Sequence, residues 1–324
     1  SKFRTSSSRI QSLSRSILLT VAYSAQFGHA LSAKQIFRRL IGEVPRDIDS
    51  SHFLISLRWL VHDRLLKEIK TKNGVLYTTP QTEMFDFSQE LVDQKYTEIK
   101  PLLKFASKIP FVKAVVVTGS VAAGAVRAKD DIDFLIITQE NRLWITRPLI
   151  VLYGWMKGKR RSWHTEEPNS WCFNFWLEET NLALPKKRWT LYSAYELCQA
   201  TFVYQASRQK NEISTEIAFL LSNTWAFYRL PVYFSGRVVQ AKKREFSAES
   251  KIRPSLFLVF AFFASSVVSP VLCVLNFLAY IIQLCYMYPH RTIEQVSRHT
   301  AFFHPRDTKK QVYLGWKRGL HGKF

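Results

Sequence analysis

One stretch decides the fold: FVKAVVVTGSVAAGAVRAKDDIDFLIIT, from Phe111 to Thr138. The part before Gly119–Ser120 is rich in β-branched residues and has the length of a buried strand. A short segment of small residues follows the Gly-Ser pair and is suited to start a helix. The run Asp131–Asp133 then leads into a second apolar segment of strand length. The stretch therefore predicts a strand, a Gly-Ser turn, a helix and a second strand.

The two acidic residues Asp131 and Asp133 point to one face of a strand, because side chains alternate along it. Two carboxylates that close repel each other, and a divalent cation removes the repulsion. Mg²⁺ prefers one or two carboxylates together with water and phosphate oxygens. The Gly119–Ser120 turn offers backbone N–H groups and a hydroxyl, which suit a triphosphate. The pattern therefore predicts a cation site beside a phosphate site.

In these residues the chain resembles the nucleotidyltransferase superfamily that includes DNA polymerase β. The signature of that superfamily is Gly-Ser, a spaced Gly and Asp-x-Asp in a strand, which this chain matches with Gly119, Ser120, Gly124, Asp131 and Asp133. The resemblance implies transfer of a nucleoside monophosphate from an NTP, with pyrophosphate leaving, assisted by two Mg²⁺ ions or by Mn²⁺. It implies that the glycines and the serine bind the nucleotide and that the aspartates are catalytic and hold the metal.

The superfamily also uses a third carboxylate on an adjacent strand. The strand-like segment Trp171–Leu177 is followed by Glu178 and Glu179. Glu178 is the first candidate for the third catalytic and metal-binding residue, and Glu179 is the second. Alternation places Glu178 on the face of Asn174, and the sequence leaves open whether that face looks toward the two aspartates.

The N-terminal part has another pattern. Two short amphipathic segments, the second opened by the capping-box sequence Ser32–Gln35, precede a third that is apolar at helical spacing from Phe53 to Val61. Two strand-like runs then bracket Asn73-Gly74, which supplies the positive φ angles of a tight hairpin. This order resembles the winged helix-turn-helix family over residues 14–80, in which the third helix faces a nucleic-acid groove.

Basic residues of this unit are candidates for nucleic-acid contact, namely Arg58, Lys70 and Lys72. A protein-contact or packing module is the alternative, because surface lysines and arginines are common. The net charge of +21 favours acidic or phosphate-bearing partners. Basic runs at 157–161, 186–188 and 242–244 extend the surface that a nucleic acid could follow. The wider likeness is to bacterial proteins that join a winged helix to a nucleotidyltransferase domain.

Together these patterns predict an α+β protein with three parts. They are a winged helix-turn-helix over 14–80, a polymerase-β-like nucleotidyltransferase core with a mixed sheet over 88–185, and C-terminal helical additions over 186–324. The last part contains a long apolar segment at 255–289, which is long enough to span a bilayer core of ~30 Å. Against spanning, Pro270 splits this segment, and Asn276 and Gln283 lie on one helix face, as in a buried helix with a polar seam. The alternative is a hydrophobic hairpin buried in the protein.

The composition excludes a disordered chain, with nine Trp, thirteen Tyr and twenty-four Phe, and four scattered Cys indicate no disulfide scaffold. We expect a cytoplasmic protein, either free or associated with a membrane through 255–289. Two functions fit these patterns. The first is Mg²⁺-dependent nucleotidyl transfer to a nucleic acid, a protein or a small molecule. The second is a nucleic-acid-binding regulator whose nucleotidyltransferase-like domain senses a nucleotide without catalysis. The residues specify neither the base of the NTP nor the oligomeric state.

Overall fold

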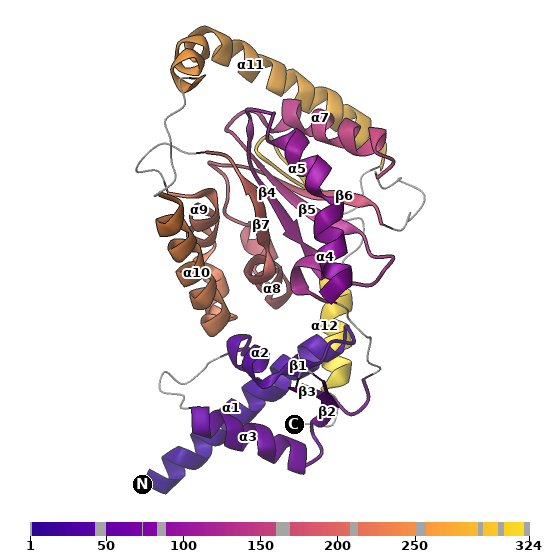
Figure 1. The fold of residues 1–324 in the computed structure, drawn as a ribbon, viewed down its shortest axis with the longest axis vertical. Helices are drawn as coiled ribbons and strands as arrows, with labels where there is room; N and C mark the ends of the chain where they lie inside the picture. The colour runs from indigo at the N-terminus through magenta and orange to yellow at the C-terminus, as the bar shows by residue number, and fades with distance from the viewer. Residues whose placement is uncertain are drawn as a thin grey trace.

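The computed structural model describes residues 2–42, 50–72, 74–82, 89–159, 169–207, 213–249, 257–290, 294–303 and 308–320. These residues form a small N-terminal unit and a larger unit built around a mixed sheet (Figure 1). A C-terminal helix, α12 (Thr308–Gly319), returns to the small unit and lies against its first helix.

In the described residues, the small unit combines helices with an antiparallel sheet of strand order β1-β3-β2. Its elements are α1 (Lys2–Ala25), β1 (Leu31–Ser32), α2 (Ala33–Arg38), α3 (Ser50–His62), β2 (Lys67–Thr71) and β3 (Gly74–Thr78). Ser32 and Gln35 form the expected capping box, because each side chain accepts a hydrogen bond from the backbone N–H of the other. The hairpin turns at Gly74, whose φ is 121°, and Asn73 lies outside the described residues. The order of elements agrees with the expectation, and the winged-helix assignment itself stays a prediction.

The larger unit holds a sheet that has the strand order β7-β4-β5-β6-β9-β8 in the part that the structure describes. The strands are β4 (Val112–Thr118), β5 (Ile132–Thr138), β6 (Trp171–Glu178), β7 (Thr201–Gln205), β8 (Gln295–Val296) and β9 (Thr300–Phe302). β5 and β6 run parallel and the other neighbours antiparallel, so the sheet is mixed as predicted. Because β7, β8 and β9 come from beyond residue 185, the predicted boundary at 185 cuts through this sheet, and the segment 186–324 is not purely helical.

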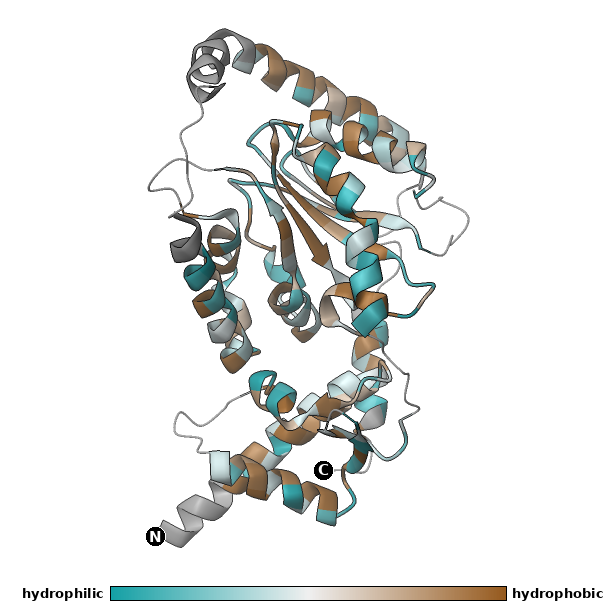
Figure 2. Cartoon of the chain, in the orientation of Figure 1, coloured by the Kyte–Doolittle hydropathy of each residue, from teal (hydrophilic) through white to brown (hydrophobic). Residues whose placement is uncertain are grey.

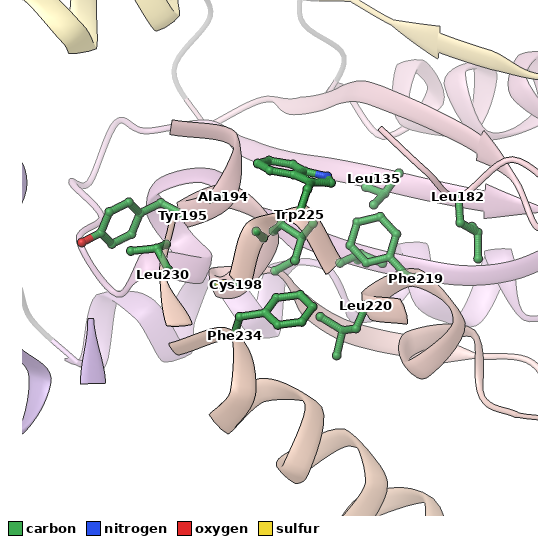
Figure 3. Packing of buried hydrophobic residues seen from close by; sticks show 14 of the residues in the cluster. Leu135, Leu182, Ala194, Tyr195, Cys198, Phe219, Leu220, Trp225, Leu230 and Phe234 are labelled. Atoms are coloured by element: carbon green, nitrogen blue, oxygen red, sulfur yellow. The ribbon is translucent and has the colours of Figure 1, made fainter. Parts of the chain in front are cut away.

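Helices cover both faces of the sheet (Figure 1). On one face lie α4 (Gln89–Glu98), α5 (Lys100–Ala106) and α7 (Leu143–Met156), and on the other α8 (Leu191–Gln199), α9 (Thr215–Ser222) and α10 (Pro231–Glu249). Strand alternation explains the two cores: Phe134 of β5 packs toward α7, whereas Leu135 packs toward α8 and α10. Figure 3 shows the second core, where aromatic and aliphatic side chains of α8, α9 and α10 meet the sheet. A further long helix, α11 (Phe257–Met287), lies on α7.

The N-terminal unit has a core of its own, and its Tyr23 and Ile41 also join the core on the α8 side of the sheet. Tyr23 of α1 stacks on Tyr195 of α8 with ring centroids 4.2 Å apart, and the Tyr195 hydroxyl donates to the Arg39 carbonyl at 3.1 Å. From α12, the Trp316 indole donates to the Leu19 carbonyl at 3.1 Å. The N-terminal unit is therefore packed directly against α8, and α12 is hydrogen-bonded to α1.

Candidate active site

The turn between β4 and β5 is formed by α6 (Gly119–Ala123), a single short helical turn. It begins at Gly119 with φ of 68° and is capped by Gly124 with φ of 71°, both in the left-handed region that favours glycine. A Cβ at position 119 would collide with the Oδ2 atom of Asp133 and lie 3.2 Å from its Cγ, whereas position 124 has open space. Gly119 is therefore required by its backbone conformation and also by its closeness to Asp133.

The two aspartates lie on one face of the sheet, the face that α8 covers. Asp133 pairs with Thr118 across the β4–β5 ladder, and its Oδ1 atom accepts a hydrogen bond from the Asn174 side-chain amide at 2.5 Å. Asp131 accepts from the backbone N–H and the hydroxyl of Ser170, at 3.1 and 2.9 Å. Both carboxylates thus bond to residues at the start of β6, and Asp133 also lies directly against the Gly119 turn.

A buried lysine of α4 fixes the loop that leads into β5. The Lys95 side chain is 1% exposed, and its ammonium donates to the Asp130 carbonyl and the Asn169 side-chain oxygen at 2.5 Å each, and to the Ala128 carbonyl at 3.4 Å. Burial lowers the pKa of Lys95, and the nearby carboxylates of Glu98, Asp130 and Asp131 oppose that shift. Lys95 thus holds the backbone next to Asp131. Sequence reasoning missed it, because one lysine in a polar helix carries no distinguishing signal.

A third acidic side chain reaches the site from α8. Glu196 accepts a hydrogen bond from the backbone N–H of Gly119 at 3.3 Å. Burial raises the pKa of Glu196 to about 7, and the bond from Gly119 opposes that shift. One turn earlier, burial raises the pKa of Tyr192 well above its ordinary value, and the charges of Glu196 and Asp133 add to it. Sequence reasoning also missed Glu196; its only signal was an acidic residue within an otherwise apolar helix.

Glu178 does not join this cluster, which corrects the sequence-based expectation. A bulge in β6 explains the error: Asp133 pairs with Cys172 and Leu135 with Phe175, so β6 has one extra residue and its alternation changes faces after Asn174. Glu178 pairs with Thr138, five residues beyond Asp133 and therefore ~16 Å further along the sheet. It is fully buried and bonds to the His299 ring at 2.7 Å.

The second candidate, Glu179, is also elsewhere. Its carboxylate pairs with Lys113 at 3.2 Å and accepts from the Glu140 backbone N–H at 3.4 Å. On the adjacent strand, Asp133 pairs with Cys172, and the side chain that bonds to its carboxylate is the Asn174 amide. In the part of the chain that the structure describes, no group of three His, Cys, Asp or Glu is placed to hold a metal ion. Two carboxylates with a neutral amide fit one Mg²⁺ that brings phosphate and water ligands, and they do not supply the three acidic ligands of the expected two-ion site.

The basic residues predicted to contact nucleic acid are exposed in the N-terminal unit: Arg58 on α3, Lys70 on β2 and Lys72 beyond it. The same helix α3 also exposes large apolar side chains, including Trp59 at 50%. Several residues of the three basic runs make contacts within the protein. Lys159 pairs with Glu98 at 3.2 Å, Arg188 stacks 4.2 Å from the ring centroid of Phe302, and Arg244 pairs with Glu216 at 2.7 Å. Arg160 and Arg161 lie outside the described residues.

Comparison with known families agrees with this geometry. Residues 97–188 match the model of the nucleotidyltransferase domain family. The matched segment contains β4, α6, β5 and β6, and with them the Gly-Ser turn, both aspartates and Asn174. The chain therefore carries a nucleotidyltransferase domain, and the superfamily inferred from its Gly-Ser and Asp-x-Asp residues is confirmed. The match does not extend to residues 14–80.

No curated protein and no solved structure matches the chain. The match over residues 97–188 supports nucleotidyl transfer in general, and nucleotidyltransferase domains generally use an NTP with divalent metal ions.

Proposed function

We propose that this protein transfers a nucleoside monophosphate from an NTP to an acceptor in a Mg²⁺-dependent reaction. The observation that carries the proposal is the close approach of the Asp133 carboxylate to the Gly119 turn, where a Cβ would displace it, with Asp131 two residues before Asp133. Phosphate and metal binding need such neighbouring groups, because the cation neutralises the phosphates and the aspartates together. Mn²⁺ could replace Mg²⁺ at an oxygen-rich site of this kind.

Each side chain has a definite task in this proposal. Asp133 and Asp131 hold the cation, and Gly119, Ser120 and Gly124 hold the triphosphate. The bound cation supplies charge neutralisation and orients the phosphates for in-line attack. The Asn174 amide fixes the Asp133 carboxylate through its 2.5 Å hydrogen bond. These contacts preorganise the site, which lowers the cost of reorganising it during the reaction.

Glu196 affects phosphate binding in this proposal, because its carboxyl accepts a hydrogen bond from the backbone N–H of Gly119. A negative charge there would repel a triphosphate. With a pKa of about 7, the Glu196 carboxyl is half protonated near neutral pH, and its neutral form removes the repulsion. We therefore infer that nucleotide binding is accompanied by proton uptake at Glu196.

A second function, nucleotide sensing without transfer, is favoured by one observation. The β6 side chain that bonds to the Asp133 carboxylate is the neutral amide of Asn174, and both Glu178 and Glu179 have their partners elsewhere. A neutral amide cannot accept a proton from an attacking hydroxyl as a carboxylate can. A regulator of this kind would bind the metal-nucleotide and release it unchanged.

The exposed Arg58, Lys70 and Lys72 and the net charge of +21 favour a nucleic acid as the acceptor or as a binding partner. Contacts to phosphates weaken as counterion concentration rises. Binding of DNA or RNA to the full chain should therefore fall steeply with salt, and Lys70→Ala with Lys72→Ala should reduce the salt dependence.

The decisive experiment incubates the full chain with α-³²P-labelled NTPs, Mg²⁺ and either RNA, DNA, protein or small-molecule acceptors. Asp133→Asn should reduce labelled product by at least about a hundredfold, since a charge that holds the cation is lost while the shape is kept. Asp130→Asn is the matched control, because its carboxylate instead accepts from the Arg127 backbone N–H at 3.0 Å. Full activity of Asp133→Asn would contradict the site. Nucleotide binding without any labelled product would identify a sensor.

A further inference from the structure

One end of the molecule is covered by two adjacent apolar helices, α7 and α11 (Figures 1 and 2). Large apolar side chains point outward from both. We call them the α7–α11 apolar face: Leu149 (45% exposed), Leu152 (52%) and Trp155 (64%) of α7, and Val274 (58%), Leu278 (50%) and Ile282 (69%) of α11. Soluble monomers rarely expose so many large apolar side chains in one place, and such a surface marks an interaction site.

Two polar side chains of α11, Asn276 and Gln283, lie on the opposite, inward side of the helix. Asn276 is fully buried, and its Oδ1 atom accepts from the backbone N–H groups of Trp144 at 2.8 Å and Ile145 at 3.2 Å. It thereby caps the first turn of α7. Gln283 donates to the Trp144 carbonyl at 2.7 Å and accepts from Arg147 at 2.8 Å. These bonds fasten α11 to α7 and fix which side of it faces outward.

Charge is distributed to match an anionic surface. Arg147 is the single charged residue in the sequence of α7 and α11 together, and its guanidinium lies inward, 4.5 Å from the ring centroid of Phe303. Exposed basic residues border the apolar face. Lys157 caps the end of α7, Arg298 lies 5.5 Å from the ring centroid of Phe277 on α11, and Lys104 lies on the neighbouring helix α5.

Aromatic side chains stand at the ends of both helices. Trp155 is 64% exposed near the end of α7, and Tyr286 and Tyr288 are 61% and 73% exposed at and just beyond the end of α11. Trp and Tyr are enriched at the boundary between lipid chains and water, because one part of each ring system is apolar and another is polar. An aliphatic surface with aromatic ends and a basic border is typical of interfacial membrane binding.

We propose that the α7–α11 apolar face docks on the surface of an anionic bilayer, with α11 lying in the plane of the headgroups. Among the described residues, Ser269–Met287 is long and apolar enough to cross a bilayer. Crossing would require α11 to leave α7 and would place Asn276 and Gln283 in hydrocarbon without their partners, which is costly. Surface docking keeps every one of these hydrogen bonds. Docking of this face on a bilayer would be independent of nucleotidyl transfer.

The test is flotation of the full-length protein with vesicles of phosphatidylcholine alone or mixed with phosphatidylglycerol. The protein should float with both and more strongly with the anionic mixture. The double variant Val274→Asp and Ile282→Asp should weaken binding by at least about tenfold, since two apolar side chains no longer enter the lipid. The matched control is Leu221→Asp with Val239→Asp, which changes two apolar residues of similar exposure, 48% and 52%, on α9 and α10. It should bind as the unmodified protein does.

Three outcomes would overturn the proposal. Equal losses in the two double variants would show that added negative charge alone reduces binding. Absence of flotation, with a dimer that becomes a monomer in the Val274→Asp and Ile282→Asp variant, would make this face a contact between two copies of the chain. Retention in cell membranes after alkaline carbonate extraction would indicate a spanning helix. Circular dichroism and thermal unfolding of both double variants establish that they remain folded.

Discussion

Substitution of Gly119 by alanine tests whether the turn and Asp133 form one unit. The φ of 68° would cost an alanine about 1–2 kcal/mol of folding free energy, because left-handed backbone crowds a Cβ. The new Cβ would also collide with the Asp133 Oδ2 atom and lie 3.2 Å from Cγ, so the carboxylate must turn away by ~1 Å. That movement breaks its hydrogen bond to Asn174, which contributes about 1.5–3 kcal/mol because the acceptor is charged.

The control is Gly158→Ala, at the end of α7. Gly158 has φ of 64°, and a Cβ there meets nothing within 4 Å. It carries the same backbone cost of about 1–2 kcal/mol without touching the site. We expect Gly119→Ala to lose about 2.5–5 kcal/mol of unfolding free energy in urea titration, against about 1–2 kcal/mol for Gly158→Ala.

Nucleotide binding and transfer should separate the two variants further. A misplacement of ~1 Å at a reacting centre reduces the rate by about a hundredfold, so Gly119→Ala should lose transfer by that factor. Affinity for Mg²⁺-NTP, measured by titration calorimetry, should fall with it, while Gly158→Ala keeps both within about twofold. If the two variants bind nucleotide equally well, the contact between Gly119 and Asp133 does not shape the site and the assignment of this turn is wrong.

Two further predictions concern the acidic residues. Glu178→Gln should keep the transfer rate within about twofold of the unmodified protein's, because Glu178 lies ~16 Å along the sheet from Asp133. A loss of rate as large as that of Asp133→Asn in the same assay would show that Glu178 belongs to the metal site. Glu196 has a pKa of about 7 in the folded protein against an ordinary 4.5, so its contribution to stability is complete below about pH 4.5 and is lost as the pH rises through 7. Glu196→Gln keeps the neutral form. Between pH 5 and 8, the unfolding free energy of the unmodified protein should therefore fall by about 1–3 kcal/mol more than that of the Glu196→Gln variant, as measured by chemical denaturation. If the unfolding free energies of the two proteins change in parallel with pH, Glu196 does not titrate in this range.

The parts of the site that could be predicted from sequence are those fixed by local geometry. The Gly119–Ser120 turn, Asp131 and Asp133 follow each other within two strands, and strand alternation sets their directions without knowledge of the rest of the fold. The capping box at Ser32 and Gln35 is local in the same sense. Short spacing made these features visible, because few alternative arrangements satisfy them.

The parts that could not be predicted depend on contacts across long stretches of chain. Glu196 reaches Gly119 over 77 residues, and Lys95 reaches Asp130 over 35. Neither position has a pattern of its own, since only packing of α8 and α4 on opposite faces of the sheet brings them to the site. The prediction for Glu178 was wrong for a different reason. A bulge adds one residue to β6 relative to β5 and changes which face the later side chains point to, and the periodicity of the sequence does not reveal a bulge.

The charges around Asp131 and Asp133 suit the metal-nucleotide that we propose for a site with Asn174. The two aspartates carry a charge of about −2 when ionised, Asn174 is neutral, and the Glu196 carboxyl is partly protonated because its pKa is about 7. One divalent cation would balance the aspartates, and phosphate oxygens would supply its remaining ligands. A third carboxylate in place of Asn174 would add a negative charge that a single cation leaves uncompensated. The amide at Asn174 and the raised pKa of Glu196 act in the same direction, since both reduce the negative charge that an incoming triphosphate must meet.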